Sequence, residues 1–306
     1  MKKTSSTIVF FGSGPVASAS LEFLAKNFTI EAVITKAKPP HHKSPAPVEI
    51  LAKKLELPTF FANTKLELDE VLGQKKFSSP LGVIVDYGVI VSTNSINSFA
   101  KGIVNSHFSL LPEWRGADPI SFSILSGQKE TGVSLMAIVP ELDEGQLLSQ
   151  QTIPIKKSAT NPELTEQLID LSNRMLLHDL PLYLTGKIVP YDQTSTGISY
   201  SRKINKSDGI LDWSKAAIQL DREVRAYIDW PKSRTTILKK EVIITKTSVS
   251  KINLTPAKPG ELDINPMTGN IVVQTGSGCL CILGIKPVGK KEMTSAEFIR
   301  GYSSPA

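Results

Sequence analysis

Two polar side chains in this sequence share a spacing that could support chemistry on a carbonyl group. Asn105 and His107 follow an apolar run, Gly102–Val104, that is typical of the end of a buried strand. Residues two apart in an extended segment point to the same side, so the amide and the imidazole share one face. Such a pair could stabilise a negatively charged oxygen and handle a proton.

A carboxylate later in the chain could orient and charge that imidazole. Asp143 lies in the loop 140–145, after a second apolar run at 133–139. Glu144 is its neighbour and its rival, and a turn carboxylate is often only a loop cap. The residues alone leave the choice between these two carboxylates open.

The elements that must position these side chains alternate between strands and helices. Apolar runs predict strands at 8–11, 30–35 and 81–85, and helical spacing predicts helices at 16–26 and 48–55. This alternation favours a parallel α/β sheet, and the uniformly apolar strands fit burial on both faces.

The second half of the chain has a different pattern. A long helix is predicted after Asn161, ending near Gly186, and the segment 187–206 has little apolar content and is interpreted as a linker. Beyond it we expect one short helix, 214–227, and several short strands separated by turns. These strands are predicted at 234–238, 242–246, 271–275 and 279–283. Short strands with turn signals indicate a small barrel or sandwich.

Composition narrows the class of protein. No apolar run approaches the ~20 residues of a membrane span, and the apolar stretch near the N-terminus is too short for a signal peptide, so we expect a cytoplasmic protein. The net charge of +6 permits an anionic partner without requiring one. Cys279 and Cys281 have no further cysteine or nearby histidine to complete a zinc set, so no metal is expected.

A glycine-rich turn after the first predicted strand resembles a dinucleotide-binding fingerprint. The residues Gly12-Ser-Gly14 and Ala17 fit its glycine positions. The fingerprint also needs an acidic residue at the end of the second strand, where this chain has Thr35 and Lys36. We therefore interpret the segment as a tight strand-to-helix turn that could line a cleft.

The stretch Asn105–Gly116, with Asp143 downstream, resembles the signature of the folate-dependent formyltransferases, and most closely of those members that act on methionyl-tRNA. The similarity covers nearly the whole chain. Further matching landmarks are Val9–Gly14, Glu130–Val133, Leu142–Gly145, Ile210–Trp213, Trp230-Pro231 and Gly289–Met293.

The resemblance implies a fold class and a division into domains. It implies an α/β, Rossmann-like formyltransferase domain with a parallel-rich sheet, followed by a small OB-like β-barrel domain. We expect the catalytic domain at 1–188, a linker at 189–206 and a tRNA-binding domain at 207–306.

The resemblance also implies an activity. The formyl group would pass from 10-formyltetrahydrofolate to the amino group of initiator methionyl-tRNA, giving N-formylmethionyl-tRNA for translation initiation. Asn105, His107 and Asp143 would be catalytic. The folate donor would be bordered by Ser109, Leu110, Leu111 and Pro112. No metal is implied, and a monomer is expected.

One departure from the family pattern concerns the tRNA. The loop after the second strand is usually rich in arginine and glycine, but here it carries Lys36, Lys38 and Lys43 among prolines and histidines. We expect these lysines, with Lys290 and Lys291, to contact phosphates.

Three alternatives stay open. The acceptor could be an amino-sugar nucleotide, water could replace the amine so that the folate is hydrolysed, or the protein could be a non-catalytic RNA-binding relative.

Overall fold

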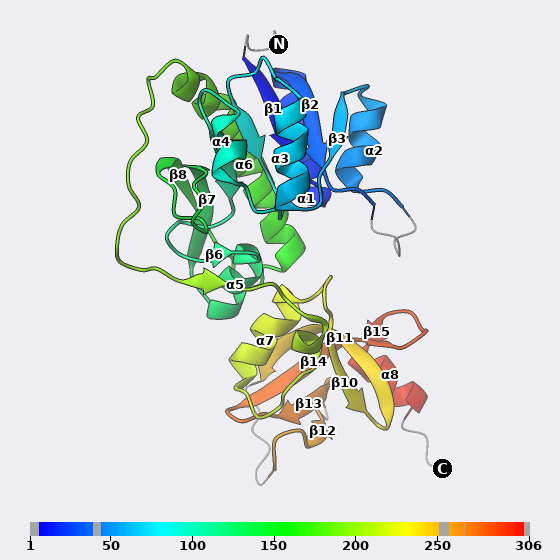
Figure 1. The fold of residues 1–306 in the computed structure, drawn as a ribbon. Helices are drawn as coiled ribbons and strands as arrows, with labels where there is room; N and C mark the ends of the chain where they lie inside the picture. The colour runs from blue at the N-terminus through cyan, green and yellow to red at the C-terminus, as the bar shows by residue number, and fades with distance from the viewer. Residues whose placement is uncertain (1–5, 39–43, 251–256, 266, 303–306) are drawn as a thin grey trace. The chain divides into compact units, whose positions relative to one another are not determined.

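The computed structural model describes residues 6–38, 44–250, 257–265 and 267–302 (Figure 1). The chain divides into two compact units, which are described separately. The first comprises 1–119, 130–154 and 165–202, and the second comprises 120–129, 155–164 and 203–306. Most of the segment that sequence analysis interprets as a linker therefore packs with the first unit.

The first unit is built on one seven-stranded sheet with the order β3-β2-β1-β4-β5-β7-β8. Its strands are β1 (Thr7–Phe11), β2 (Thr29–Thr35), β3 (Thr59–Phe61), β4 (Gly82–Ile84), β5 (Ile103–His107), β7 (Glu130–Ala137) and β8 (Leu147–Pro154). β3, β2, β1, β4 and β5 run parallel, whereas β7 and β8 are antiparallel additions. The predicted parallel-rich α/β sheet is confirmed.

Helices cover both faces of this sheet. They are α1 (Pro15–Asn27), α2 (Pro47–Lys54), α3 (Lys65–Gln74), α4 (Thr93–Asn97) and α6 (Asn161–Leu184). In Figure 1, α3 and α4 lie in front of the sheet and α6 passes behind it. On the front face Val9, Phe11 and Ile103 pack with Leu68 and Leu72 of α3 in one buried cluster.

The segment after α6 returns along the first unit. Tyr191 exchanges two backbone hydrogen bonds with Leu147 at the start of β8, at 2.8 and 3.0 Å. Further on, β9 (Tyr200–Ser201) pairs in parallel with β6 (Arg115–Gly116). The two pairings hold the returning segment at both ends.

The second unit is an antiparallel β domain. Its strands are β10 (Ser233–Ile237), β11 (Lys240–Ser250), β12 (Leu262–Ile264), β13 (Ile271–Gln274), β14 (Cys279–Pro287) and β15 (Met293–Thr294). They follow the order β10-β11-β14-β13-β12, with β15 added beside β14. α5 (Pro119–Ser126) lies mostly in this unit, with the 3-10 turn Lys206–Gly209 and helices α7 (Ala217–Ala226) and α8 (Ser295–Tyr302).

A single buried cluster fills the concave side of this sheet. Leu220 and Val224 of α7, Phe298 of α8 and apolar side chains from β11, β13 and β14 form it. The small OB-like domain expected from the resemblance is confirmed as a curled antiparallel sheet. β11 extends to Ser250, beyond the predicted 242–246, because Thr247 and Ser248 continue the pairing with β14 without adding apolar residues.

Candidate active site

β5 presents the two residues that opened the sequence analysis. It pairs in parallel with β4 and antiparallel with β7, so Asn105 lies beside Ile84 and Met136. Asn105 is half-buried and His107 is 6% exposed. Ser106, between them, faces the other way, and its hydroxyl lies 2.7 Å from that of Ser172 on α6. The predicted sharing of one face by Asn105 and His107 follows from this alternation.

Both ring nitrogens of His107 face polar atoms. Nε2 lies 3.0 Å from the carbonyl oxygen of Trp114. A carbonyl oxygen only accepts, so Nε2 donates in this contact. Nδ1 lies 3.8 Å from Oδ2 of Asp143, an ion-pair distance if the imidazole is protonated. The structure therefore brings together His107, at the end of β5, and Asp143, in the loop between β7 and β8, which lie 36 positions apart in the sequence.

The carboxylate of Asp143 has a second partner that fixes its direction. The amide nitrogen of Gly116 donates to Oδ2 at 2.7 Å. Gly116 adopts a φ of 112°, and a Cβ there would lie 2.2 Å from the carbonyl oxygen of Ser201, so only glycine fits between β9 and the carboxylate. Glu144, the rival carboxylate, points elsewhere and pairs with Arg115 at 2.8 Å.

A third residue, which sequence analysis missed, binds the Asp143 loop from the returning segment. The Nε2 atom of Gln193 donates to the carbonyl oxygens of Asp143 and Gly145, at 2.7 and 2.9 Å. Its Oε1 accepts from Nη2 of Arg115 at 2.9 Å. A polar residue in a segment without periodicity gives no local signal, so only the tertiary structure identifies it.

The residues expected to border the folate are mostly buried and hydrogen-bonded inside the first unit. Ser109 is fully buried and donates to the carbonyl oxygen of Glu113, and the amide of Leu111 donates to the hydroxyl of Ser134 at 3.0 Å. Leu110 and Pro112 complete this segment, which follows His107 in the chain after a single intervening residue. Their contact with a folate stays a prediction.

A charged group lies where β1, β2 and β4 end. The carboxylate of Asp86 lies against Gly14, where an added Cβ would be 2.2 Å from Oδ2. Burial of this carboxylate raises the pKa of Asp86 to about 6, against the opposing effect of Lys36 and with a small contribution from Asp118. Taken as a whole, the residue is nevertheless exposed to solvent. A perturbed carboxyl at the carboxyl ends of parallel strands marks this edge as a candidate binding region.

Lys36 was expected to face tRNA, and the structure gives its ammonium another partner. Nζ donates to the carbonyl oxygen of Gly88 at 2.9 Å. Lys38 is exposed, and Lys43 lies outside the described residues. Among the described lysines of this loop, Lys38 is the one placed at the surface for a phosphate.

Two further observations concern a metal site and a membrane-spanning helix. Within the described ranges, no group of three or more His, Cys, Asp or Glu side chains is arranged to hold a metal ion. No helix in the part of the chain that the structure describes is long and apolar enough to cross a bilayer.

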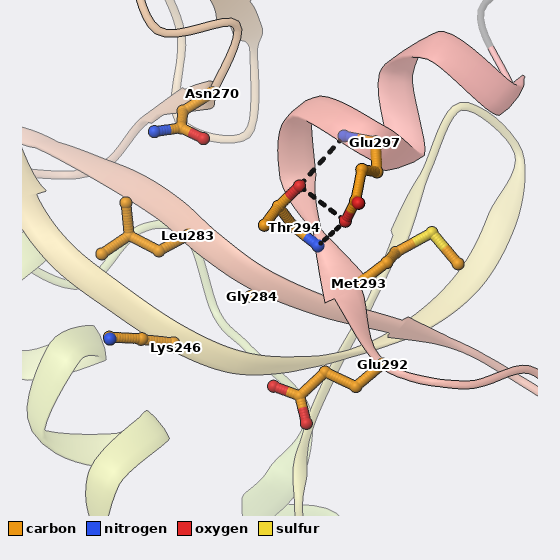
Figure 2. Close-up of a pocket in the computed structure, with 8 residues that line it drawn as sticks. All are labelled: Lys246, Asn270, Leu283, Gly284, Glu292, Met293, Thr294 and Glu297. Carbon is orange, nitrogen blue, oxygen red and sulfur yellow. Dashed lines mark hydrogen bonds between the residues drawn. The ribbon is translucent and has the colours of Figure 1, made fainter.

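A depression in the second unit has no part in the site built around His107. Figure 2 shows hydrogen bonds between two of the residues that line it, Thr294 and Glu297. Thr294 donates to Glu297 through its amide and its hydroxyl, both at 2.8 Å, at the start of α8. Glu292 accepts from Thr245 at 2.6 Å. These contacts stabilise a helix terminus and a strand pair.

Curated relatives resemble the chain over nearly its whole length. A methionyl-tRNA formyltransferase of Methylococcus capsulatus is 35% identical over 97% of this chain and 97% of its own length. One of Roseiflexus castenholzii is 33% identical over 96% of this chain and 95% of its own.

A solved structure shares the fold. The N-formyltransferase of Helicobacter canadensis, in complex with folinic acid and dTDP-3-aminofucose, is 19% identical and has a TM-score of 0.68, with 91% of this chain and 99% of that one covered. Two family models match this sequence. The formyl transferase model matches residues 6–180, and the model of the formyl transferase C-terminal domain matches 203–303. The chain therefore belongs to the formyl transferase family.

Proposed function

We propose that this chain transfers the formyl group of 10-formyltetrahydrofolate to the amino group of initiator methionyl-tRNA. One observation carries the proposal: relatives named methionyl-tRNA formyltransferase match both units at 33–35% identity over at least 95% of their own lengths. The N-formyltransferase solved in complex with dTDP-3-aminofucose is 19% identical to this chain, so that likeness supports the fold alone.

The reaction needs no nucleophile from the protein, because the acceptor amine attacks the formyl carbon itself. A bond forms between the amine nitrogen and that carbon, the bond from the carbon to the folate nitrogen breaks, and one proton passes from the amine to the folate nitrogen. The carbonyl oxygen becomes negative on the way. Donors that meet this oxygen stabilise the transition state more than the ground state.

Asn105, His107 and Asp143 suit this demand, and we assign them the catalytic roles. Asn105 contributes a neutral amide donor from the same face of β5 as the imidazole. His107 contributes a charged donor when protonated, and Oδ2 of Asp143 lies 3.8 Å from its Nδ1. Nε2 donates to the carbonyl oxygen of Trp114, so we expect the ring to shift, or to share this hydrogen, when it meets the carbonyl oxygen of the formyl group.

The decisive experiment incubates the purified protein with 10-formyltetrahydrofolate and charged initiator tRNA. We expect formylated methionyl-tRNA, with one folate consumed per product. Free methionine and a reaction without acceptor serve as controls. Absence of product with active tRNA and folate would refute the proposal.

The same assay separates the alternatives. Formylation of a dTDP-amino sugar and not of the tRNA would indicate a sugar-nucleotide enzyme. Folate loss without acceptor would indicate a hydrolase, and tRNA binding without turnover would indicate a non-catalytic relative. We also propose that the protein is a cytoplasmic monomer, with a catalytic domain at 1–188, a linker at 189–206 and a tRNA-binding domain at 207–306. Sedimentation of the protein at several concentrations tests the monomer.

A further inference from the structure

We propose that Gln193 is a positioning residue for formyl transfer, holding the two loops that surround His107 in their working geometry. The inference rests on the proposed function. It assigns a role at the active site to the segment between the two domains, which sequence analysis interprets as a linker.

The contacts of Gln193 connect the two loops directly. Its Nε2 donates to the carbonyl oxygens of Asp143 and Gly145, and its Oε1 accepts from Arg115. These three bonds, at 2.7, 2.9 and 2.9 Å, use both the nitrogen and the oxygen of the Gln193 side-chain amide. Arg115 is 6% exposed and completes the link by pairing with Glu144, next to Asp143.

Both of the connected loops touch the imidazole. The loop of Arg115 supplies the Trp114 carbonyl that accepts from Nε2, and the other loop supplies the carboxylate beside Nδ1. Trp114 and Asp143 adopt φ values of 55° and 52°, conformations that non-glycine residues rarely take. Strained backbone of this kind persists where surrounding contacts hold it, and Gln193 is such a contact for Asp143.

Gln193 can hold the loops because its own segment is fixed on both sides. Two residues before it, Tyr191 pairs with Leu147. Farther along, the amide of Arg115 donates to the carbonyl oxygen of Ser199 at 2.9 Å, and β9 pairs with β6. The segment acts as a strap across the edge of the site, and Gln193 is its contact with the carboxylate loop.

Two variants separate the functions of the two ends of the amide. Gln193→Ala removes all three bonds. Gln193→Glu keeps an acceptor for Arg115 but cannot donate to the two carbonyl oxygens. Asp192→Ala is the matched control, because Asp192 is on the same segment and, among the residues that the structure describes, its side chain accepts from Gln146 alone, at 2.9 Å.

In formyl transfer by the full-length protein, we expect kcat to fall at least about tenfold in both Gln193 variants, since misplacement by ~1 Å can cost ~10²-fold. KM for folate and tRNA should stay within about threefold, because the Gln193 side chain bonds to Asp143, Gly145 and Arg115, whereas the strap meets the proposed folate loop through a different residue, Ser199, whose amide donates to the carbonyl oxygen of Pro112 at 3.2 Å. Asp192→Ala should match the wild type.

Coupling to Asp143 tests that Gln193 acts through it. The double variant Asp143→Asn with Gln193→Ala should be no slower than Asp143→Asn alone, because residues in one network are not additive. Full additivity, a change confined to KM, or kcat values in both Gln193 variants within about twofold of wild type would each overturn the inference.

A second readout does not depend on turnover. The NMR chemical shifts of the labelled His107 imidazole should change in Gln193→Ala and not in Asp192→Ala, because the Trp114 carbonyl and the Asp143 carboxylate beside the ring would move. An inactive wild-type protein in which Gln193→Ala still changes these signals would sink the proposed function and keep the positioning role. Unchanged imidazole signals in Gln193→Ala would sink the positioning role even if the wild type formylates tRNA.

Discussion

The amide nitrogen of Gly116 lies 2.7 Å from Oδ2 of Asp143, the same carboxylate oxygen that lies 3.8 Å from Nδ1 of His107. The backbone donor thus points the carboxylate at the imidazole. The side chain of Asp143 is only 11% exposed, whereas that of Glu144 is 44% exposed and pairs with Arg115. This difference in placement separates two adjacent acids that the sequence alone leaves as rivals.

Replacing Asp143 by Asn should lower kcat by about 10²-fold or more, the size of the loss expected for one charged donor. The Asn side chain can still accept from Gly116 and tolerates a positive φ, so the geometry is kept and only the charge is lost. Glu144→Gln should stay within about threefold, because its pair with Arg115 is partly solvated. A large loss of kcat in Glu144→Gln, together with near-wild-type kcat in Asp143→Asn, would exchange the two roles.

His107→Ala should reduce formyl transfer by about 10²–10³-fold while the protein remains folded. The imidazole is buried at the end of β5, and its nitrogen atoms face the carbonyl oxygen of Trp114 and the carboxylate of Asp143. His178→Ala is the control, since that ring is 75% exposed on α6. Single-turnover rates and circular dichroism spectra of both variants provide the check. A His107→Ala rate within about threefold of wild type would remove the imidazole from the mechanism.

Lys38 and Lys43, in the segment after β2, should set the salt dependence of tRNA use. We expect the double change Lys38→Ala and Lys43→Ala to weaken kcat/KM for tRNA. The slope of log KM against log salt should fall by about one for each lost phosphate contact. Lys36→Ala should leave the slope unchanged, because its ammonium is bonded to Gly88. Identical slopes for the double variant and the wild type would move the phosphate contact elsewhere, with Lys290 and Lys291 as the next candidates.

The carboxyl group of Asp86 should make the free energy of unfolding decrease as pH rises, the opposite of the usual effect of an aspartate. Its pKa is raised to about 6, so between the ordinary value of 3.8 and this value the folded state binds more protons than the unfolded state. Its contribution to stability therefore falls as pH rises through this window. Asp86→Asn, which tolerates the φ of 47°, should raise the melting temperature above pH 6 and have little effect near pH 4. Thermal unfolding at both pH values measures this, and a gain that is equal at the two would contradict it.

Local sequence signals predicted the elements that are apolar throughout. β1, β2, α1 and α6 begin and end within about two residues of the predictions, because their buried positions form continuous runs or a clear helical stripe. α3 was missed, because only Leu68 and Leu72 are fully buried among its charged residues. α8 was missed for the same reason.

The candidate site was predictable only in part, because some of its relationships are local in the sequence and others arise from tertiary contacts. The shared face of Asn105 and His107 follows from strand geometry, which is local. The approach of Asp143 depends on the antiparallel pairing of β5 with β7, which the apolar runs in the sequence do not specify. Gln193 depends on the return of a segment with no apolar pattern, so its place could be found only in three dimensions. The raised pKa of Asp86 likewise reflects neighbours distant in the chain.

The parallel pairing of β9 with β6 has a consequence for building chimeras with other acceptor-recognition domains. A splice at residue 188 would remove Gln193 and the Ser199–Ser201 stretch from the catalytic half and leave the carboxylate loop without its brace. A splice after Ser201 would transfer the brace intact. The part of this chain that can be exchanged to change the acceptor therefore begins downstream of Ser201, although the composition of the sequence would place the cut earlier.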